Sequence, residues 1–324
     1  MTGSAISRRA FMQATTLGTA FALTSRDADA AGASIDENEA ILSDARAAEA
    51  QPAPRGKIIA FSKPFTNLSF DETAALVAEV GWDGIECPVR KTSTHIAPER
   101  VDDDLPRMVE ALKKRRLDVA MITTDITGVD PTAERILRAA VKSGIRNYRL
   151  GAMHYTADRP IPAQLEEIKA RLRDLAQLNK SLGVVGGIEN HSGPDYFGGP
   201  IWDAMQVIQP LDPAAIGIAF DIGHATIEGG LAWPLHARLA APRYTVVYVK
   251  DYRWEKTATG WRPAWCPLGQ GMISRKFFST LAASGYRGPL CQHHEYDLGK
   301  TPAEMMTCFK QDLQTFRDWL REAV

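Results

Sequence analysis

Eight short runs rich in β-branched residues recur along the chain, and each is followed by a stretch with the apolar spacing of a helix. The runs are Ile58–Ser62, Gly84–Pro88, Val119–Thr123, Asn147–Leu150, Val184–Ile188, Ile216–Phe220, Thr245–Val249 and Pro289–His293. Their mean spacing of roughly 33 residues is the size of one strand–helix unit. Eight such units in succession predict a single (β/α)₈ barrel over residues 57–324.

The intervening segments carry explicit helix start and stop signals. Ser69 and Glu72 form a capping-box pattern before one helix, and Gly81 follows it. Asp130 followed by Pro131 is an N-cap pattern before another helix. The alternative architecture is an open, doubly wound sheet. The Gly-x-Gly-x-x-Gly pattern that often follows its first strand is missing here, which favours the closed barrel.

The first 30 residues read as an export signal. Arg8 and Arg9 precede a mildly apolar stretch, and the sequence Ala-Asp-Ala at 28–30 offers a cleavage site. This order resembles a signal for twin-arginine export, which implies a periplasmic or otherwise exported protein. The alternative is an amphipathic start with a chance arginine pair. Residues 31–56 read as a linker.

Composition narrows the classes of function. The 38 basic and 39 acidic residues nearly cancel, giving a net charge of −1. Proteins that mainly bind nucleic acid usually show a basic excess, so we expect no nucleic-acid partner. No run of about 18 apolar residues occurs, so we expect no membrane-spanning helix in the exported chain. Oligomeric state cannot be inferred from the sequence.

Ionisable residues follow the predicted strands, at the end of a barrel where active sites lie. Three carboxylates, Glu189, Asp221 and Glu295, follow the fifth, sixth and eighth runs. Like charges at such close range would force protons onto some of these groups unless a cation offsets them. We favour a divalent metal ion held by carboxylate and imidazole. The alternative is that the carboxylates pair with Lys250, Arg149 or helix N-termini.

Five motifs in order then resemble the xylose isomerase-like barrels, a family of sugar isomerases and ketose 3-epimerases whose fold is shared by endonuclease IV. The motifs are Ile-Glu-Asn-His at 188–191, Phe-Asp-Ile-Gly-His at 220–224, Tyr-Val-Lys-Asp at 248–251, Pro-Leu-Gly-Gln-Gly at 267–271 and His-x-Glu-Tyr at 293–296. The resemblance implies a divalent ion, Mn²⁺ in first place and Mg²⁺, Co²⁺ or Zn²⁺ otherwise. It places the ion on Glu189, Asp221 and Glu295, with His224 as a further ligand or a substrate contact.

The chain departs from this pattern at one position. The family's histidine on the seventh strand falls at Tyr248, and a neutral phenol is a poor ligand. His224, His293 or water could take the vacant ligand position. The departure also bears on the reaction, because a metal-dependent isomerase or epimerase, a lyase on 3-keto sugars or 3-keto glycosides, and a non-catalytic sugar-binding barrel all remain possible.

The expected chemistry is removal of a proton next to a carbonyl of a small sugar. The resemblance gives this role to Glu189 and Glu295. His191, two residues beyond Glu189, is either the base itself or a group that orients Glu189.

We expect His95, His154, Lys250 and Trp254 to contact the substrate. Trp254, Trp261 and Trp265 fall in the long segment after the seventh strand, where indole could stack on a sugar or fill the loop itself. Gly269 and Gly271 form either a tight turn or a phosphate cradle.

Overall fold

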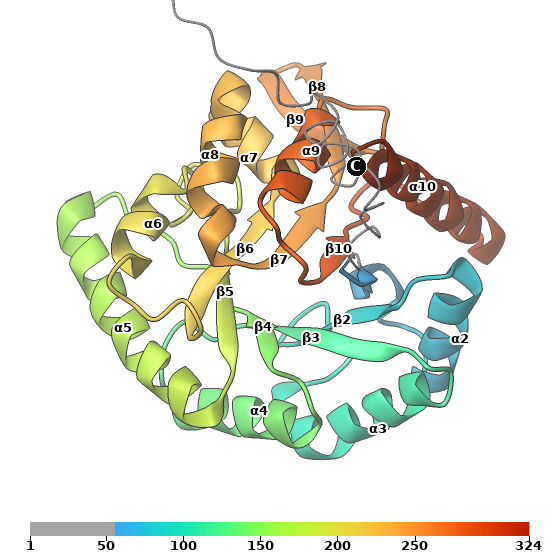
Figure 1. Ribbon diagram of the computed structural model, residues 1–324, viewed down its shortest axis with the longest axis horizontal. Coiled ribbons are helices and arrows are strands. Elements are labelled where there is room, and N and C mark those ends of the chain that lie inside the picture. The colour runs from blue at the N-terminus through green and yellow to red at the C-terminus, as the bar shows by residue number, and fades with distance from the viewer. Residues whose placement is uncertain (1–55, 324) are drawn as a thin grey trace, which may run out of the picture. The chain divides into compact units, whose positions relative to one another are not determined.

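A computed structural model describes residues 56–323 and shows a closed barrel of parallel strands surrounded by helices (Figure 1). The strand order is β1-β10-β7-β6-β5-β4-β3-β2, and β1 closes the barrel by pairing with both β10 and β2. The predicted (β/α)₈ barrel is confirmed. The predicted signal at 1–30 and the linker up to residue 55 lie outside the described residues.

The eight barrel strands coincide closely with the predicted runs. They are β1 (Ile58–Phe61), β2 (Gly84–Val89), β3 (Asp118–Thr124), β4 (Asn147–Arg149), β5 (Val185–Glu189), β6 (Ile216–Asp221), β7 (Tyr244–Val249) and β10 (Leu290–Gln292). Short 3₁₀ turns lie at Lys63–Phe65, Pro98–Arg100, Gly230–Ala232 and Ala241–Arg243.

Nine described helices accompany the strands, and their predicted caps are present. They are α2 (Phe70–Val80), α3 (Val101–Lys113), α4 (Pro131–Lys142), α5 (Ile161–Leu182), α6 (Trp202–Ile208), α7 (Ile222–Gly229), α8 (Trp233–Ala240), α9 (Lys276–Ala283) and α10 (Pro302–Glu322). Ser69 and Glu72 close the capping box of α2, which ends at Gly81 in a left-handed conformation. The Asp130 side chain accepts from the third residue of α4. Within residues 56–323, no helix combines the length and apolar character needed to cross a bilayer.

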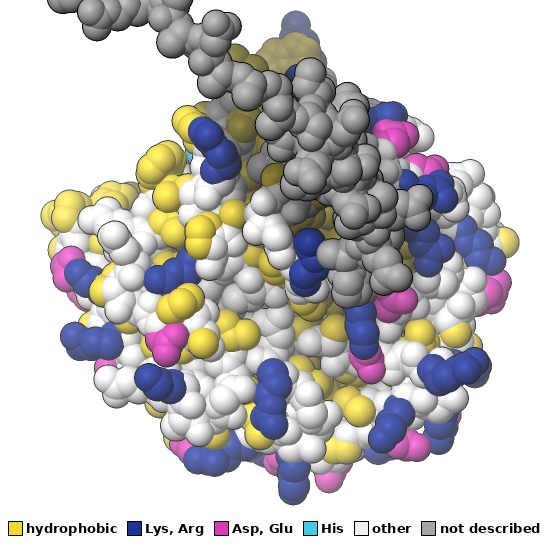
Figure 2. All heavy atoms as spheres, in the orientation of Figure 1, with side chains coloured by type: hydrophobic (Ala, Val, Ile, Leu, Met, Phe, Trp, Pro, Cys, Tyr) yellow, Lys and Arg dark blue, Asp and Glu magenta, His cyan; other side chains and the backbone are white. Residues whose placement is uncertain are grey.

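Two hydrophobic cores hold the barrel. The larger core packs the outer faces of the strands against the helices. The smaller core fills the barrel interior and consists of Ile59, Phe61, Met121, Ala219, Val246, Tyr248 and Cys291. Charged side chains of both signs are interspersed around the helical ring (Figure 2). The polar side chains at the strand ends therefore lie within an otherwise apolar interior.

The segment after β7 differs from the expected loop. It forms an antiparallel hairpin, β8 (Asp251–Thr257) and β9 (Gly260–Cys266), inserted between β7 and α9 (Figure 1). Its register pairs Tyr252 with Trp265, Trp254 with Pro263 and Lys256 with Trp261. Because side chains alternate along a strand, these residues share one face, and the aromatic residues on it reach from the buried Tyr252 to the exposed Trp261.

Candidate active site

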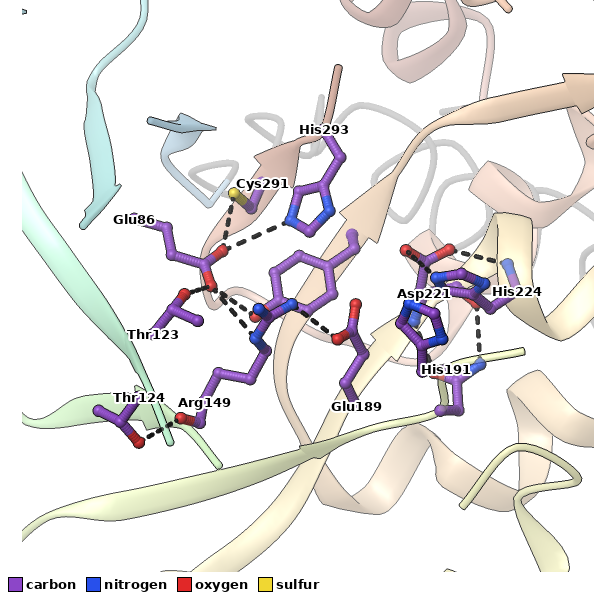
Figure 3. A network of polar contacts seen from close by, with 12 residues as sticks. Glu86, Thr123, Thr124, Arg149, Glu189, His191, Asp221, His224, Cys291 and His293 are labelled. Atoms are coloured by element: carbon purple, nitrogen blue, oxygen red, sulfur yellow. Dashed lines mark hydrogen bonds and ion pairs between the residues drawn. The ribbon is translucent and has the colours of Figure 1, made fainter. Parts of the chain in front are cut away.

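The alternation of side chains along each barrel strand brings the ionisable groups together. On β6, Ala219 lies in the interior core and Asp221, two residues on, also points inward. On β7, Val246 and Tyr248 belong to that core, and Lys250 continues the same face. Because every second residue of a strand points into the barrel, the apolar side chains at the barrel centre are followed by inward-pointing charged side chains at the strand ends. We call these charged side chains the charged layer. Figure 3 shows part of this layer.

An arginine holds the first carboxylate. Arg149 Nη1 donates to Glu189 Oε2 at 2.6 Å, and Arg149 Nε lies 3.8 Å from Glu86 Oε1 (Figure 3). Burial acts to raise the pKa of Glu189, but Arg149 and, more weakly, His191, Lys250 and His293 together lower it below its usual value. Arg149 makes the largest of these contributions, which keep Glu189 ionised.

Glu86 is fully buried and saturated with donors. Its Oε1 accepts from Tyr248 Oη at 3.0 Å and, in a short contact, from Thr123, while Oε2 accepts from Cys291 Sγ at 3.2 Å. His293 Nε2 lies 3.5 Å from Oε2. Burial opposes ionisation, but His293, Arg149 and Thr123 together lower the pKa of Glu86 to about 2.

The described hydrogen bond of Tyr248 thus goes to Glu86 and not to Glu189, Asp221 or Glu295, so Tyr248 does not replace the family's histidine. Its hydroxyl serves Glu86, and burial raises its pKa well above the usual range. A phenol held neutral in this way is a hydrogen-bond donor to a buried carboxylate.

Lys250 lies among the remaining groups as an internal cation. Its Nζ is 2.8 Å from His224 Nε2, 3.2 Å from Asp221 Oδ2 and 3.4 Å from Glu295 Oε1. Burial would lower the pKa of Lys250, but Asp221 and Glu295 raise it above its usual value. The ion pairs that the sequence offered as an alternative to metal binding, through Lys250 and Arg149, are therefore present.

The two neighbouring histidines have assignable tautomers. An ammonium group only donates, so His224 Nε2 accepts from Lys250, and its Nδ1–H donates to Ser192 Oγ at 2.7 Å. A carbonyl only accepts, so His191 Nδ1–H donates to the Ser192 oxygen at 2.8 Å. Burial, followed by the charge of Lys250, lowers the pKa of His224 well below its usual value. His224 is therefore neutral, as a metal-ligating imidazole must be.

The donor set fits a divalent ion. Ligand atoms of Glu189, Asp221 and His224 lie within 4.8 Å of one another. Asp221 Oδ2 is buried, and among the described residues it has the ion pair with Lys250 Nζ at 3.2 Å but no well-aligned hydrogen bond. Burial raises the pKa of Asp221 despite Lys250. A second group, Glu86, Cys291 and His293, also satisfies the distance. Its carboxylate already has three donors, and burial raises the thiol pKa of Cys291 well above its usual range, so the first group suits a metal better.

Charge points the same way. Four carboxylates, Glu86, Glu189, Asp221 and Glu295, share this layer with the two fixed cations Arg149 and Lys250. If all are ionised and the histidines are neutral, these six groups carry two negative charges in excess. Arg90 and Lys63 line the neighbouring cavity but form no ion pair with them among the described residues, so a divalent ion would offset the excess at Glu189 and Asp221 directly. Such an ion would compete with the Lys250 ammonium for Asp221 and His224.

A cavity of about 220 Å³ opens beside this layer. Its ionisable lining includes Arg149, Glu189, His191 and Glu295, and its apolar lining includes Phe61 and Phe197. This is smaller than the roughly 300–1,000 Å³ of most ligand pockets, so it suits a molecule about the size of a monosaccharide. Burial acts to raise the pKa of Glu295, but the nearby charges of Lys250, His293 and Lys63 outweigh burial and lower the pKa to about 2.

The other predicted substrate contacts lie outside the lining of this cavity. His95 packs against Phe65, with ring centroids 6.1 Å apart, and burial lowers its pKa to about 4. His154 is exposed, with Nδ1 3.2 Å from Asp195 Oδ2. Trp254 is 40% exposed on the hairpin. Nearer the site, Trp265 lies 4.3 Å from Lys250 Nζ and connects the hairpin to the charged layer.

The Gly269–Gly271 turn does not form a phosphate cradle. The N–H groups of Gly269 and Gly271 both donate to Asp251 Oδ2 at 3.0 Å. An internal carboxylate thus occupies the place of an external anion.

The comparisons with known proteins agree with this architecture. Residues 74–318 match the family model described as the xylose isomerase-like TIM barrel. The chain belongs to this family. No curated protein matches it at a significant level.

Solved structures of the same fold include sugar-converting enzymes. A 3-keto-D-glucoside 4-epimerase from E. coli is 19% identical, with a TM-score of 0.63 over 83% of this chain and 100% of that chain. A D-psicose 3-epimerase studied with D-fructose is 15% identical, with a TM-score of 0.62 over 82% and 99%. A xylose isomerase-like barrel protein from Mycobacterium smegmatis in complex with magnesium is 16% identical, with a TM-score of 0.61 over 83% and 98%.

Lys250→Met is expected to strengthen binding of Mn²⁺ by about tenfold or more. A unit charge about 4 Å from an ion costs several kcal/mol even at an effective dielectric constant of about 20. Calorimetric titration of purified protein with Mn²⁺ measures the change. Lys256→Met, which removes an exposed lysine of the hairpin, is the matched control and should leave affinity unaltered. Weaker binding by Lys250→Met would show that Lys250 supports the ion rather than competing with it.

Proposed function

We propose that the protein is a divalent-metal-dependent isomerase or epimerase that removes a proton next to the carbonyl of a small sugar. The observation that carries this proposal is the shared cavity of Glu189, Glu295 and His191, with a metal-ligand set beside it. Groups that accept and return a proton thus line one space of monosaccharide size. The fold of known sugar epimerases supports the same reading.

Glu189, Asp221 and His224 would hold the ion, with Glu295 beside them. When bound, it would polarise the substrate carbonyl and offset the negative charge that develops as the proton leaves. We favour Mn²⁺ over Mg²⁺, Co²⁺ and Zn²⁺, because a protein that folds before export is loaded in the cytoplasm, where availability decides between metals.

His191 is our preferred base. Its Nδ1–H is committed to the Ser192 carbonyl, which leaves the Nε2 lone pair available in the neutral ring. Glu295, with a pKa of about 2, is a weak base in the metal-free layer. Glu189 is bonded to Arg149, and no described hydrogen bond joins it to His191. This arrangement supports His191 as a proton acceptor rather than as a residue that orients Glu189.

A lyase acting on 3-keto sugars or 3-keto glycosides is the second candidate. Tyr248, in place of the family's histidine, favours it, because the metal surroundings then differ from those of the epimerases. The lyase reaction begins with the same proton removal. A non-catalytic sugar-binding barrel is the third candidate, and the exposed indoles of Trp254 and Trp261 would suit it.

Export through the twin-arginine pathway is part of the proposal and rests on residues 1–30. Replacing Arg8 and Arg9 by Lys should leave the protein in the cytoplasm, since the pathway reads the arginine pair. Cell fractionation and immunoblotting measure this. A variant that still reaches the periplasm in full would mean that residues 1–30 do not act as this signal.

Metal-loaded protein in D₂O should place deuterium next to the carbonyl of a keto sugar, because isomerase, epimerase and lyase all begin by proton removal. NMR of free and 3-keto sugars measures the incorporation. His191→Asn should reduce the rate by about 10²–10⁴ if His191 is the base. A loss nearer 10–100-fold would fit a residue that orients Glu189.

Two controls accompany this experiment. His236→Asn removes an imidazole from α8, away from the cavity, and should leave exchange intact once folding is checked. The Mn²⁺ content of each variant separates loss of the base from loss of the ion. Absence of exchange with a broad panel of sugars by metal-loaded protein would favour the sugar-binding barrel.

A further inference from the structure

We propose that Arg90 and Lys63 form a subsite for an anionic group, a carboxylate or phosphate, carried by the sugar substrate. Both side chains line the cavity that holds Glu189, His191 and Glu295. The inference rests on the proposed function, because it names the class of sugar that the same cavity would take.

The cations of this region differ in how they are compensated. Arg149 is paired with Glu189, and Lys250 with Asp221 and Glu295. Within residues 56–323, neither Arg90 nor Lys63 forms an ion pair with an acidic side chain. Asp125 also lines the cavity, but its described hydrogen bond is from the Lys91 backbone N–H at 2.9 Å. Two cations thus face the cavity without direct carboxylate partners.

Arg90 is held in place at this wall. Its Nε and Nη2 both donate to the Ser93 carbonyl at 3.3 Å, which leaves Nη1 available. Ser93 has a φ of 47°, a left-handed conformation unusual for a residue other than glycine. Backbone strain of this kind clusters at ligand-binding sites, where it fixes a group in position. Here it fixes the carbonyl that orients the Arg90 guanidinium.

Arg90 and Arg149 both lie over the aromatic ring of Phe61. Arg90 Cζ lies 5.6 Å and Arg149 Cζ 5.2 Å from the centroid of Phe61. Burial, followed by repulsion from Arg149, lowers the pKa of Arg90. An anion bound to Arg90 would offset this repulsion, and the planar guanidinium suits carboxylate and phosphate oxygens. Lys63 lines the same cavity and would add a second positive charge.

The subsite also orients the substrate. Glu189 and Glu295 repel an anionic group from the part of the cavity where the proton is removed. An anion held by Arg90 and Lys63 therefore leaves the carbonyl end of a small sugar free to approach His191. The turn at Gly269–Gly271 offers no competing site, because Asp251 already occupies its N–H groups.

Calorimetric titration of the full, Mn²⁺-loaded protein tests the subsite with matched sugars. D-Glucuronate is compared with D-glucose, and D-fructose 6-phosphate with D-fructose, which separates carboxylate from phosphate recognition. We expect at least one acidic sugar to bind about 10–100-fold more tightly than its neutral partner, the usual worth of a charge-assisted hydrogen bond. Arg90→Gln and Lys63→Met should each reduce that preference by weakening binding of the acidic sugar more than binding of its neutral partner.

Lys91→Met removes an exposed lysine next to Arg90 that does not line the cavity, and it should preserve the preference. Arg90→Lys keeps the charge without the planar fork and should restore part of it. Equal binding of acidic and neutral sugars, no binding of either acidic sugar, or a preference that survives both substitutions would overturn the subsite. Because affinity and deuterium exchange are separate measurements, a protein that prefers acidic sugars yet exchanges no deuterium would contradict the proposed reaction alone.

Discussion

The ammonium of Lys250 among Asp221, Glu295 and His224 is the contact on which the candidate site depends. Charges this deeply buried are tolerated only when they are paired and hydrogen-bonded. Arg149 likewise pairs with Glu189 and donates a hydrogen bond to it. Together the two cations keep the charged layer compact, yet they leave an excess of negative charge that prepares the layer for a metal ion.

The carboxylates have different roles because their surroundings differ. Glu86 accepts hydrogen bonds from Tyr248, Thr123 and Cys291 and has a structural role in the barrel. Asp221 Oδ2 has only the ion pair with Lys250 among the described residues, and burial raises the pKa of Asp221, so an added cation would stabilise its ionised form. Similar groups at equivalent strand ends therefore take different roles, one structural and one suited to binding a metal.

The sequence was sufficient for the fold because each strand and helix carries its own signal. The capping box at Ser69 and the N-cap at Asp130 are local features, and the structure contains both. Strand-end positions predicted a ligand set of Glu189, Asp221 and Glu295, with His224 beside it. The structure brings ligand atoms of Glu189, Asp221 and His224 within 4.8 Å of one another, whereas Glu295 lies outside that group and pairs with Lys250. The apolar run Gly84–Pro88 also contains a carboxylate, Glu86, but the hydrogen bonds that surround Glu86 in the structure could not be inferred from that run.

Long-range geometry was beyond the sequence. The hairpin at 251–266 depends on pairing between two short strands whose residues resemble a loop. The place of Lys250 depends on how far its side chain reaches across the barrel. The role of Arg90 depends on the left-handed turn at Ser93, for which a serine gives no signal.

The central claim is that the charged layer is a metal site which the Lys250 ammonium occupies when no metal is bound. It is tested most directly by a crystal structure with Mn²⁺ and its anomalous difference map. The account predicts a peak within bonding distance of Glu189, Asp221 and His224, with Lys250 Nζ displaced. No peak there at saturating Mn²⁺, with Lys250 still among Asp221, Glu295 and His224, would contradict it.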